Sequence, residues 1–366
     1  MNVKFKMPVE IIMSENCLSA EIPTLATYGQ TAALMIDLNA CDASGVLVDL
    51  IPALEQAGIS YIRFDAPQNA ACMEYVLQTA LEVRKASVDM VIAVGDTRIV
   101  DAGKVVAALA AQDTMLAESD VKAGKLAPNA LPLIAVATSP EVPAALTPFA
   151  VMTDTQGEIF ICSSETFFAK QLLIDPGYAR RSFWRVFASS AFEAIGNVVE
   201  ICTSVNDSCR FALPLAKGSF AELRLVLLSM NEDDINDYTI DLLVSSGLKI
   251  GLVAGLTGMS HFRLMACHLA AVMGISCGRA IRLLLIPYLR VVQRKKPYLV
   301  DSIIHALGFP DLSGFEKLIS DVMPEKEQLS EVSIEKVRKQ ILACDAGDQC
   351  AIALTEQEID EILMQI

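Results

Sequence analysis

Positive charge is scarce in this chain of 366 residues, which carries 29 Lys and Arg against 44 Asp and Glu, a formal net charge of −15. Nucleic acids are bound largely through Lys and Arg contacts to phosphate, so the charge balance argues against a nucleic-acid partner. The same excess of negative charge weakens attraction to anionic membrane surfaces. We therefore expect neither a nucleic acid nor a membrane as partner.

A disulfide framework and an export signal are also missing. The ten cysteines are scattered from Cys17 to Cys350 without clustered spacing. No N-terminal segment combines a basic start, an apolar stretch and a small-residue cleavage site. Reduced and mostly buried thiols in a cytoplasmic protein are the better interpretation.

Long uninterrupted apolar runs are absent too. The longest candidate, Leu242–Leu256, is broken by Ser245, Ser246 and Lys249. A transmembrane helix needs about 20 mostly apolar residues, so we interpret this stretch as a buried helix.

Histidine is rare, with three residues in the chain. No Ser–His–Asp or Cys–His arrangement for nucleophilic catalysis is visible. His261 and His268 lie on one helical segment, where they could line a cavity, but a lone histidine there is more often a hydrogen-bonded core residue. His305 has no partner that the sequence identifies.

The first half of the chain alternates short apolar runs with helical patterns, which is typical of a parallel sheet covered on both faces. The predicted strands are Ala32–Leu38, Tyr61–Phe64, Met90–Val94 and Leu133–Val136, and the predicted helices are Val46–Ala57, Ala71–Lys85 and Val100–Ala111. Pro52 either kinks the first helix or makes it begin later. A further strand within Phe5–Met13 could pair across a dimer interface.

From about Phe183 onward, helical segments follow one another without strands. The predicted helices are Phe183–Thr203, Phe220–Met230, Asp234–Ser246, Phe262–Met273, Arg279–Arg290, Leu299–Leu307, Ser333–Ala343 and Thr355–Gln365. Thr355 and Glu358 form a capping box at the start of the last helix. The pattern predicts an α/β domain with a parallel sheet over residues 1–180 and an all-α domain over residues 181–366.

Two segments of the first half carry unusual motifs. Val91–Lys104, VIAVGDTRIVDAGK, runs from a strand into Gly95 and then a helix that contains Asp101 and Lys104. Val136–Asp154, VATSPEVPAALTPFAVMTD, is a loop that contains Thr138 and Thr147.

Both segments resemble the iron-containing alcohol dehydrogenase family, which is related to glycerol dehydrogenases and dehydroquinate synthases. In that family a glycine triplet is followed by Ser, Asp and Lys. Here the triplet reads Gly95, Asp96 and Thr97, and the serine is Arg98. In the second segment Thr138 and Thr147 match, whereas the two loop glycines are replaced by Glu141 and Pro143, and a Ser-Glu pair by Ala144 and Ala145.

A third segment resembles the metal-binding part of the same family. After Asp175 and Pro176, the positions of an Asp and a His ligand are taken by Glu193 and Asn197. Two further His ligands, fourteen residues apart, correspond to Arg263 and Cys277, which is followed by Gly278. A family histidine near the nicotinamide corresponds to Cys267.

The resemblance implies a dinucleotide-binding-type first domain and a helical metal- and substrate-type second domain. It also implies NAD or NADP, a divalent iron or zinc ion, a small-molecule ligand in an interdomain cleft, and a homodimer. The implied cofactor positions are Asp37, Gly95, Asp96, Thr97, Arg98, Asp101, Lys104, Thr138 and Thr147.

The departures fall on the positions that would carry the chemistry. A carboxylate at ~4 Å from a phosphate costs about 1 kcal/mol in water and about 4 kcal/mol near a protein surface, so Asp96 and Glu141 oppose a dinucleotide. Arg98 could offset this by reaching a phosphate, or it could pair with Asp96 or Asp101.

The metal positions leave two interpretations open. Asn197 is a poor ligand and Arg263 cannot be one because it stays protonated, although its charge could replace the ion by pairing with Glu193. Alternatively, Glu193, Cys267 and Cys277 hold zinc, unless both cysteines are simply buried. The chain is then either a divergent protein without ordinary metal-dependent hydride transfer or an active NAD(P)-dependent alcohol dehydrogenase with an altered metal site.

Overall fold

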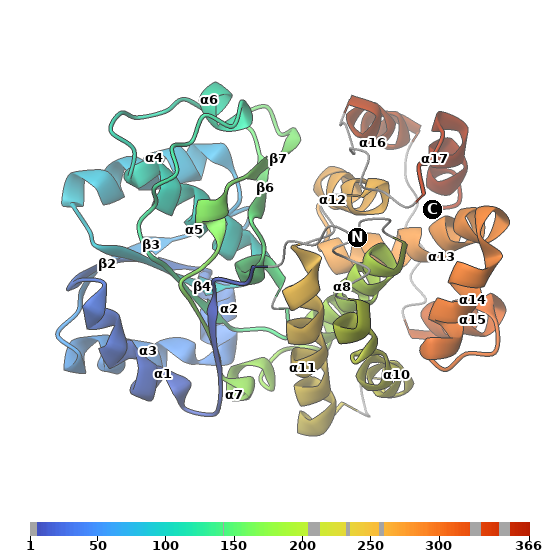
Figure 1. The fold of residues 1–366 in the computed structure, drawn as a ribbon, viewed down its shortest axis with the longest axis horizontal. Coiled ribbons are helices and arrows are strands. Elements are labelled where there is room, and N and C mark those ends of the chain that lie inside the picture. The colour runs from blue at the N-terminus through green and yellow to red at the C-terminus, as the bar shows by residue number, and fades with distance from the viewer. Residues whose placement is uncertain are drawn as a thin grey trace. The chain divides into compact units, whose positions relative to one another are not determined.

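The computed structural model describes residues 6–141, 143–203, 213–231, 235–255, 260–322, 331–343 and 352–366. Contacts divide them into two compact units, one of Lys6–Phe183 and one that contains Trp184–Ile366 (Figure 1). The first unit holds a parallel sheet with helices, and the described part of the second is helical. The predicted fold class is therefore confirmed.

A six-stranded parallel sheet in the order β1-β8-β5-β4-β2-β3 forms the centre of the first unit. Its strands are β1 (Glu10–Met13), β2 (Thr31–Ile36), β3 (Ser60–Asp65), β4 (Met90–Gly95), β5 (Leu133–Ala137) and β8 (Gln171–Ile174). The strands β2, β4, β5 and β8 are apolar and buried almost throughout, as a sheet covered on both faces requires.

The strand predicted within Phe5–Met13 is present as β1, and Phe5 lies outside the described residues. It pairs in parallel with β8 of the same chain. Because β1 is an edge strand, its pairing across a dimer interface stays a prediction.

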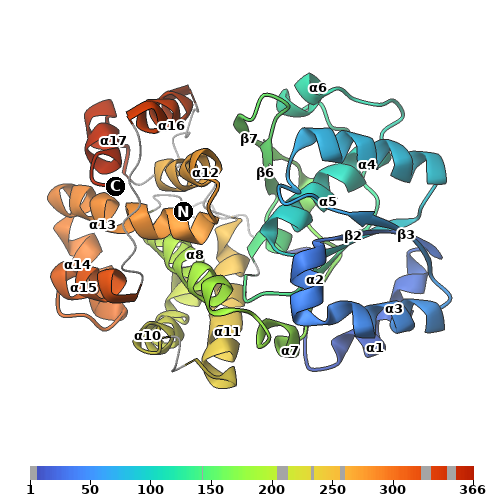
Figure 2. The same cartoon turned by 180° about the vertical axis from the view of Figure 1, so that it is seen from behind.

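Helices cover both faces of this sheet (Figures 1 and 2). On one face, Leu34 and Ile92 pack in a core with α1 (Cys17–Glu21), the 3₁₀ turn η1 (Ile22–Thr27) and α3 (Val46–Gln56). The other face is covered by α4 (Met73–Ala86) and α5 (Thr97–Ala110). The helix α3 begins at Val46 and runs through Pro52, so the later start weighed for it is not observed.

Two element ends differ from the prediction because an aspartate caps each following helix. The strand β2 stops at Ile36 rather than Leu38, since the Asp37 carboxylate accepts a 3.1 Å hydrogen bond from the Ala40 N–H and starts α2 (Leu38–Ser44). The helix α5 begins at Thr97 rather than Val100, because Asp96 is its N-cap. A side-chain acceptor at this position satisfies a free N–H of the first turn.

Several short elements of the first unit were not predicted. They are α1, η1, α2 and the strand β8, together with α6 (Glu118–Lys122), the 3₁₀ turns η2 (Pro143–Leu146) and η3 (Glu165–Phe167), the antiparallel pair β6 (Phe149–Thr153) and β7 (Ile159–Ser163), and α7 (Pro176–Ala179). These elements are too short for a periodic pattern to show in the sequence.

The second unit is a bundle in which the helix α13 packs against α8, α12, α14 and α17. Its described helices are α8 (Trp184–Thr203), α10 (Phe220–Leu228), α11 (Asp237–Ala254), α12 (His261–Met273), α13 (Cys277–Lys295), α14 (Pro297–Ala306), α15 (Leu312–Val322), α16 (Glu331–Ala343) and α17 (Glu356–Leu363). The helix predicted at Asp234–Ser246 extends further, to Ala254, and so includes most of the apolar stretch Leu242–Leu256; Asp234 and Leu256 lie outside the described residues. The helix α15 was not predicted.

Close packing of α8 on α13 depends on a glycine. A Cβ at Gly278 would lie 2.0 Å from the Ser189 carbonyl oxygen, so no other residue fits without movement of the backbone. Among the described residues, α8 is also the one helix long and apolar enough to span a membrane, but 83% of its most apolar window is buried within the protein. Its apolar character is therefore accounted for by the bundle core.

Candidate functional site

The predicted cofactor residues collect at the carboxyl edge of the sheet. After β3 the chain crosses to the far side of β2 to form β4, and in α/β sheets ligands bind where the strand order reverses in this way. Asp37 follows β2, Gly95 ends β4 and Thr138 follows β5. The Arg98 guanidinium lies 3.9 Å from the Asp37 carboxylate, so the two loops meet at this edge.

The turn from β4 into α5 is filled by its own side chains. Asp96 Oδ1 accepts the Arg98 backbone N–H at 2.9 Å, and Asp96 Oδ2 accepts the guanidinium through Nε at 2.9 Å and Nη2 at 2.6 Å. Arg98 Nη1 donates to the Gln68 carbonyl at 2.8 Å. The predicted pairing of Arg98 with Asp96 is confirmed, and Asp101 has a different partner.

Three carboxylates act on the Arg98 guanidinium at this turn. Burial acts to lower the pKa of Arg98, but Asp96, Asp37 and Glu141 together raise it, so the guanidinium stays charged and paired. Gly95 keeps its place because its φ is +148° and a Cβ would lie 2.7 Å from Ile99 Cγ2.

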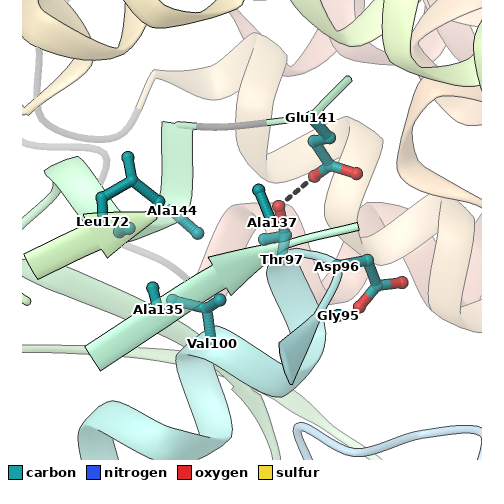
Figure 3. A pocket seen from close by; sticks show the side chains of 10 residues that line it. Gly95, Asp96, Thr97, Val100, Ala135, Ala137, Glu141, Ala144 and Leu172 are labelled. Carbon is teal, nitrogen blue, oxygen red and sulfur yellow. Dashed lines mark hydrogen bonds between the residues drawn. The ribbon is translucent and has the colours of Figure 1, made fainter. Parts of the chain in front are cut away.

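The neighbouring loop adds a second carboxylate (Figure 3). Glu141 Oε1 accepts a hydrogen bond from the Thr97 hydroxyl, the first residue of α5. Asp96 also lines the pocket between these side chains, and the other lining residues are small or apolar: Gly95, Val100, Ala135, Ala137, Ala144, Ala145 and Leu172. Its empty volume is about 240 Å³, open solvent included.

Three predicted cofactor residues form an internal network instead. Lys104 Nζ donates to Asp101 Oδ1 at 2.9 Å, to Thr147 Oγ1 at 3.2 Å and to the Phe149 carbonyl at 2.6 Å. Asp101 Oδ2 accepts the Val151 N–H at 3.0 Å, which ties α5 to β6. Burial raises the pKa of Asp101 against the opposing effect of Lys104. The side chains of Lys104 and Asp101 are 0% and 5% exposed, so this ion pair serves the packing of the fold and does not face a cofactor.

One polar atom at this edge is left for a ligand. Thr138 is buried, and its hydroxyl has no hydrogen-bond partner in the described structure. Other groups at this edge oppose a phosphate. Asp96 and Glu141 are negatively charged, Asp96 already accepts the Arg98 N–H, and the Arg98 side chain is already paired with Asp96. The residues present at the β4–α5 turn therefore do not fit the pyrophosphate of a dinucleotide.

The metal-position residues lie on three helices of the second unit. Glu193 and Asn197 are one turn apart on α8 and both are buried, Arg263 and Cys267 are on α12, and Cys277 begins α13. Glu193 Oε1 accepts the Gly278 N–H at 3.0 Å, so this carboxylate caps the first turn of α13.

Arg263 is bound to the facing helix α8. Its Nε and Nη2 donate to Glu200 Oε2 at 3.2 and 3.1 Å, and Nη2 also donates to Asn197 Oδ1. Glu200 Oε1 accepts the Ser260 N–H at 3.1 Å and the Ser260 hydroxyl at 2.7 Å. The ion pair expected with Glu193 is thus made with Glu200.

The pKa of Arg263 reflects this environment. Burial acts to lower it, but the Glu200 carboxylate raises it, with smaller contributions from Cys277, Cys267 and Glu193, and the net direction is upward. The guanidinium is therefore a permanent cation within the metal position.

The donor set does not fit a divalent ion. Among the described residues, no three His, Cys, Asp or Glu side chains are arranged to hold a metal, and Glu193, Cys267 and Cys277 are not brought together as such a group. An arginine cannot ligate a metal, because its guanidinium has donors and no free acceptor.

Glu200 is the residue that the sequence analysis missed. It lies seven residues after Glu193 and three after Asn197, spacings that place all three on one face of a helix. The signal was an unexplained buried arginine, which needs a carboxylate within reach.

The histidines lie in the helical unit. His268 is 1% exposed in α12, where burial lowers its pKa to about 4 against the opposing effect of a hydrogen bond with Gln340. This agrees with its interpretation as a core residue. Burial also lowers the pKa of the half-buried His261, and His305 Nε2 lies 2.9 Å from the Pro310 carbonyl oxygen.

Comparison with known families places this geometry in context. The sequence model for iron-containing alcohol dehydrogenase matches residues 8–176, nearly all of the first unit. This part of the chain therefore matches the iron-containing alcohol dehydrogenase family. No curated protein sequence matches the chain.

Solved structures extend the likeness to the whole chain. An iron-containing alcohol dehydrogenase from Thermotoga maritima is 22% identical with a TM-score of 0.89, covering 99% of this chain and 98% of its own. An NADH-dependent butanol dehydrogenase A from the same organism is 18% identical with a TM-score of 0.86, covering 100% and 98%. A sulfoacetaldehyde reductase from Bifidobacterium kashiwanohense, in complex with NAD+, is 20% identical with a TM-score of 0.79, covering 100% and 98%.

At these identities the likeness establishes the fold of iron-containing alcohol dehydrogenases over the full chain, and not their activity. The activity depends on individual residues, and the positions described above differ from the family pattern at the phosphate turn and at the metal ligands.

Proposed function

We propose that this chain is a divergent iron-containing alcohol dehydrogenase-like protein that has lost metal-dependent hydride transfer with NAD(P). The observation that carries the proposal is the β4–α5 turn, where Asp96 occupies the N–H of Arg98 and Glu141 approaches from the next loop. In such folds a dinucleotide phosphate binds free N–H groups at a helix N-terminus. Here a carboxylate already uses one of them.

The electrostatic cost of binding is substantial. Each carboxylate within ~4 Å of a phosphate opposes binding by about 1–4 kcal/mol, which is roughly a fivefold to thousandfold loss of affinity. Arg98 offsets only part of this cost, because its charge is shared with Asp96 and three of its five N–H groups already donate to Asp96 and the Gln68 carbonyl.

Titration with NAD+, NADH, NADP+ and NADPH, followed by melting temperature and by isothermal calorimetry, tests the proposal. We expect no shift in melting temperature at millimolar nucleotide. A ligand at a hundred times its Kd stabilises the folded state by about 2.7 kcal/mol, so a shift of several degrees would refute the proposal.

A restored turn provides the matched comparison. The substitutions Asp96→Gly, Thr97→Gly and Arg98→Ser, together with Glu141→Gly, recreate the family's glycine triplet and serine and one of its two loop glycines, and they remove both carboxylates. We expect this variant to bind a nucleotide more tightly than the unmodified protein. If neither protein binds one, the obstacle lies elsewhere than in the turn, and the argument from Asp96 and Glu141 is wrong.

The alternative is an active NAD(P)-dependent alcohol dehydrogenase with a metal at Glu193, Cys267 and Cys277. The buried Thr138 hydroxyl without a partner favours it, because a ligand would satisfy that group. Elemental analysis of protein purified without a histidine tag separates the two: one zinc or iron per chain supports the alternative.

The partner and location predictions belong to this proposal as well. A small-molecule ligand, a homodimer and a cytoplasmic location are consistent with the family relationship. Gel filtration with light scattering tests the dimer.

A further inference from the structure

We propose that Arg263 is a built-in cation that takes the electrostatic place of a metal ion and joins α12 to α8 through Glu200. This deepens the proposed loss of metal-dependent activity, because it says what now fills the metal position. It assigns a structural role to a residue that the family resemblance would make a ligand.

The contacts of Glu200 support a built arrangement. Its two oxygens accept four hydrogen bonds, from the Ser260 N–H and hydroxyl and from Arg263 Nε and Nη2. The side chains of Glu200 and Arg263 are 5% and 17% exposed. Such a buried pair persists only where the surrounding hydrogen bonds are complete, and here the carboxylate is fully used.

Two of the remaining metal-position residues are also committed. Asn197 accepts from Arg263, and Glu193 accepts from the N-terminus of α13. Together these contacts link the facing ends of α8, α12 and α13, which a metal ion would otherwise link by coordination. The bundle therefore has its own internal crosslink at this point.

Glu200 also suits the helix end that it contacts. Ser260 is the N-cap of α12, and its hydroxyl accepts the Arg263 N–H at 3.2 Å while donating to Glu200. A carboxylate at a helix N-terminus is favoured by the helix dipole, so Glu200 is stabilised by α12 as well as by Arg263.

Stability measurements on substituted full-length protein test the role of the charge. Arg263→Met and Glu200→Gln each leave a buried group without its partner, and we expect each to raise the unfolding equilibrium constant about a hundredfold or more. Arg263→Lys, which keeps the charge, should lie closer to the unmodified protein than Arg263→Met. Equal losses for Lys and Met would overturn the inference.

A double-mutant cycle adds a matched control. The combined Arg263→Met and Glu200→Gln change should cost less than the product of the single effects, since the two groups are coupled. The same cycle on the exposed pair Arg294 and Glu361, whose side chains are 55% and 40% exposed, should show coupling of about fivefold or less. Coupling at Arg263 no larger than at this surface pair would refute the proposal.

Metal measurements on the unmodified protein need no variant to fold. After dialysis against zinc(II), cobalt(II) or iron(II), we expect no stoichiometric metal, and chelator should leave the melting temperature unchanged. One ion per chain, or a fall in melting temperature on chelation, would refute the built-in cation. That result would also count against the proposed loss of metal-dependent activity, whereas a failed double-mutant cycle would refute the built-in cation alone.

Discussion

Acidification should destabilise the helical unit through His268, which is 1% exposed in α12 and whose pKa burial lowers to about 4. The ordinary pKa of histidine is 6.5. Between these two values the unfolded chain takes up a proton that the folded protein does not. The contribution of the neutral His268 to the free energy of unfolding is therefore fully present above pH 6.5, and it is lost as the pH falls toward 4.

The magnitude follows from the interval between the two pKa values. About 2.5 pH units at about 1.36 kcal/mol per unit gives about 3 kcal/mol at full protonation of the unfolded chain. A domain of ordinary stability has about 5–15 kcal/mol in all, so an effect of this size is measurable.

Urea unfolding from pH 7.5 to 4.5, monitored by circular dichroism, measures this effect in the unmodified protein and in His268→Gln. Carboxylates whose pKa values are lowered in the fold, such as Asp154 beside Lys122, also lose stabilising interactions on acidification, so the difference between the two proteins is the relevant quantity. We expect His268→Gln to lose less stability over this range. Parallel pH profiles would refute the assignment of a neutral, buried imidazole.

Two further predictions concern the core of each unit. Lys104→Met should lower the free energy of unfolding by about 3–5 kcal/mol in chemical denaturation, because Asp101 would remain buried without its cation; a loss below about 1 kcal/mol would contradict this role. Gly278→Ala should cost at least about 2 kcal/mol by thermal and chemical unfolding, since its Cβ would lie 2.0 Å from the Ser189 carbonyl oxygen. Gly314→Ala, whose Cβ would meet nothing closer than 3.5 Å in the helix α15, is the matched control and should be neutral or slightly stabilising.

The alternation of strands and helices was readable from the sequence because hydrophobic periodicity reports which faces are buried. Buried runs such as Met90–Val94 appear as strands, and Thr355 caps the last helix as its spacing to Glu358 predicted. Helix starts were less accurate. At Asp37 and Asp96 a side chain rather than a hydrophobic period sets the boundary.

The partners of charged residues were predicted with less success. Arg98 was expected to pair with Asp96 or Asp101, and the structure selects Asp96 because Lys104 already holds Asp101. Arg263 was expected beside Glu193 and is found with Glu200. Sequence spacing shows which side chains share a helix face, but the register between two helices decides which of them meet, and that depends on packing across the whole bundle.

The β4–α5 turn and the contact between α8 and α12 follow the same electrostatic principle. At the β4–α5 turn, the Asp96 carboxylate accepts a helix N–H that a phosphate of the same sign would otherwise accept. Between α8 and α12, the Arg263 cation faces Glu200 at the position where the family resemblance implies a divalent cation. Each side chain supplies the sign of charge that its surroundings are arranged to receive, so neither position is left with an uncompensated helix end or carboxylate. The charges at both positions are in this way compensated by the chain's own side chains.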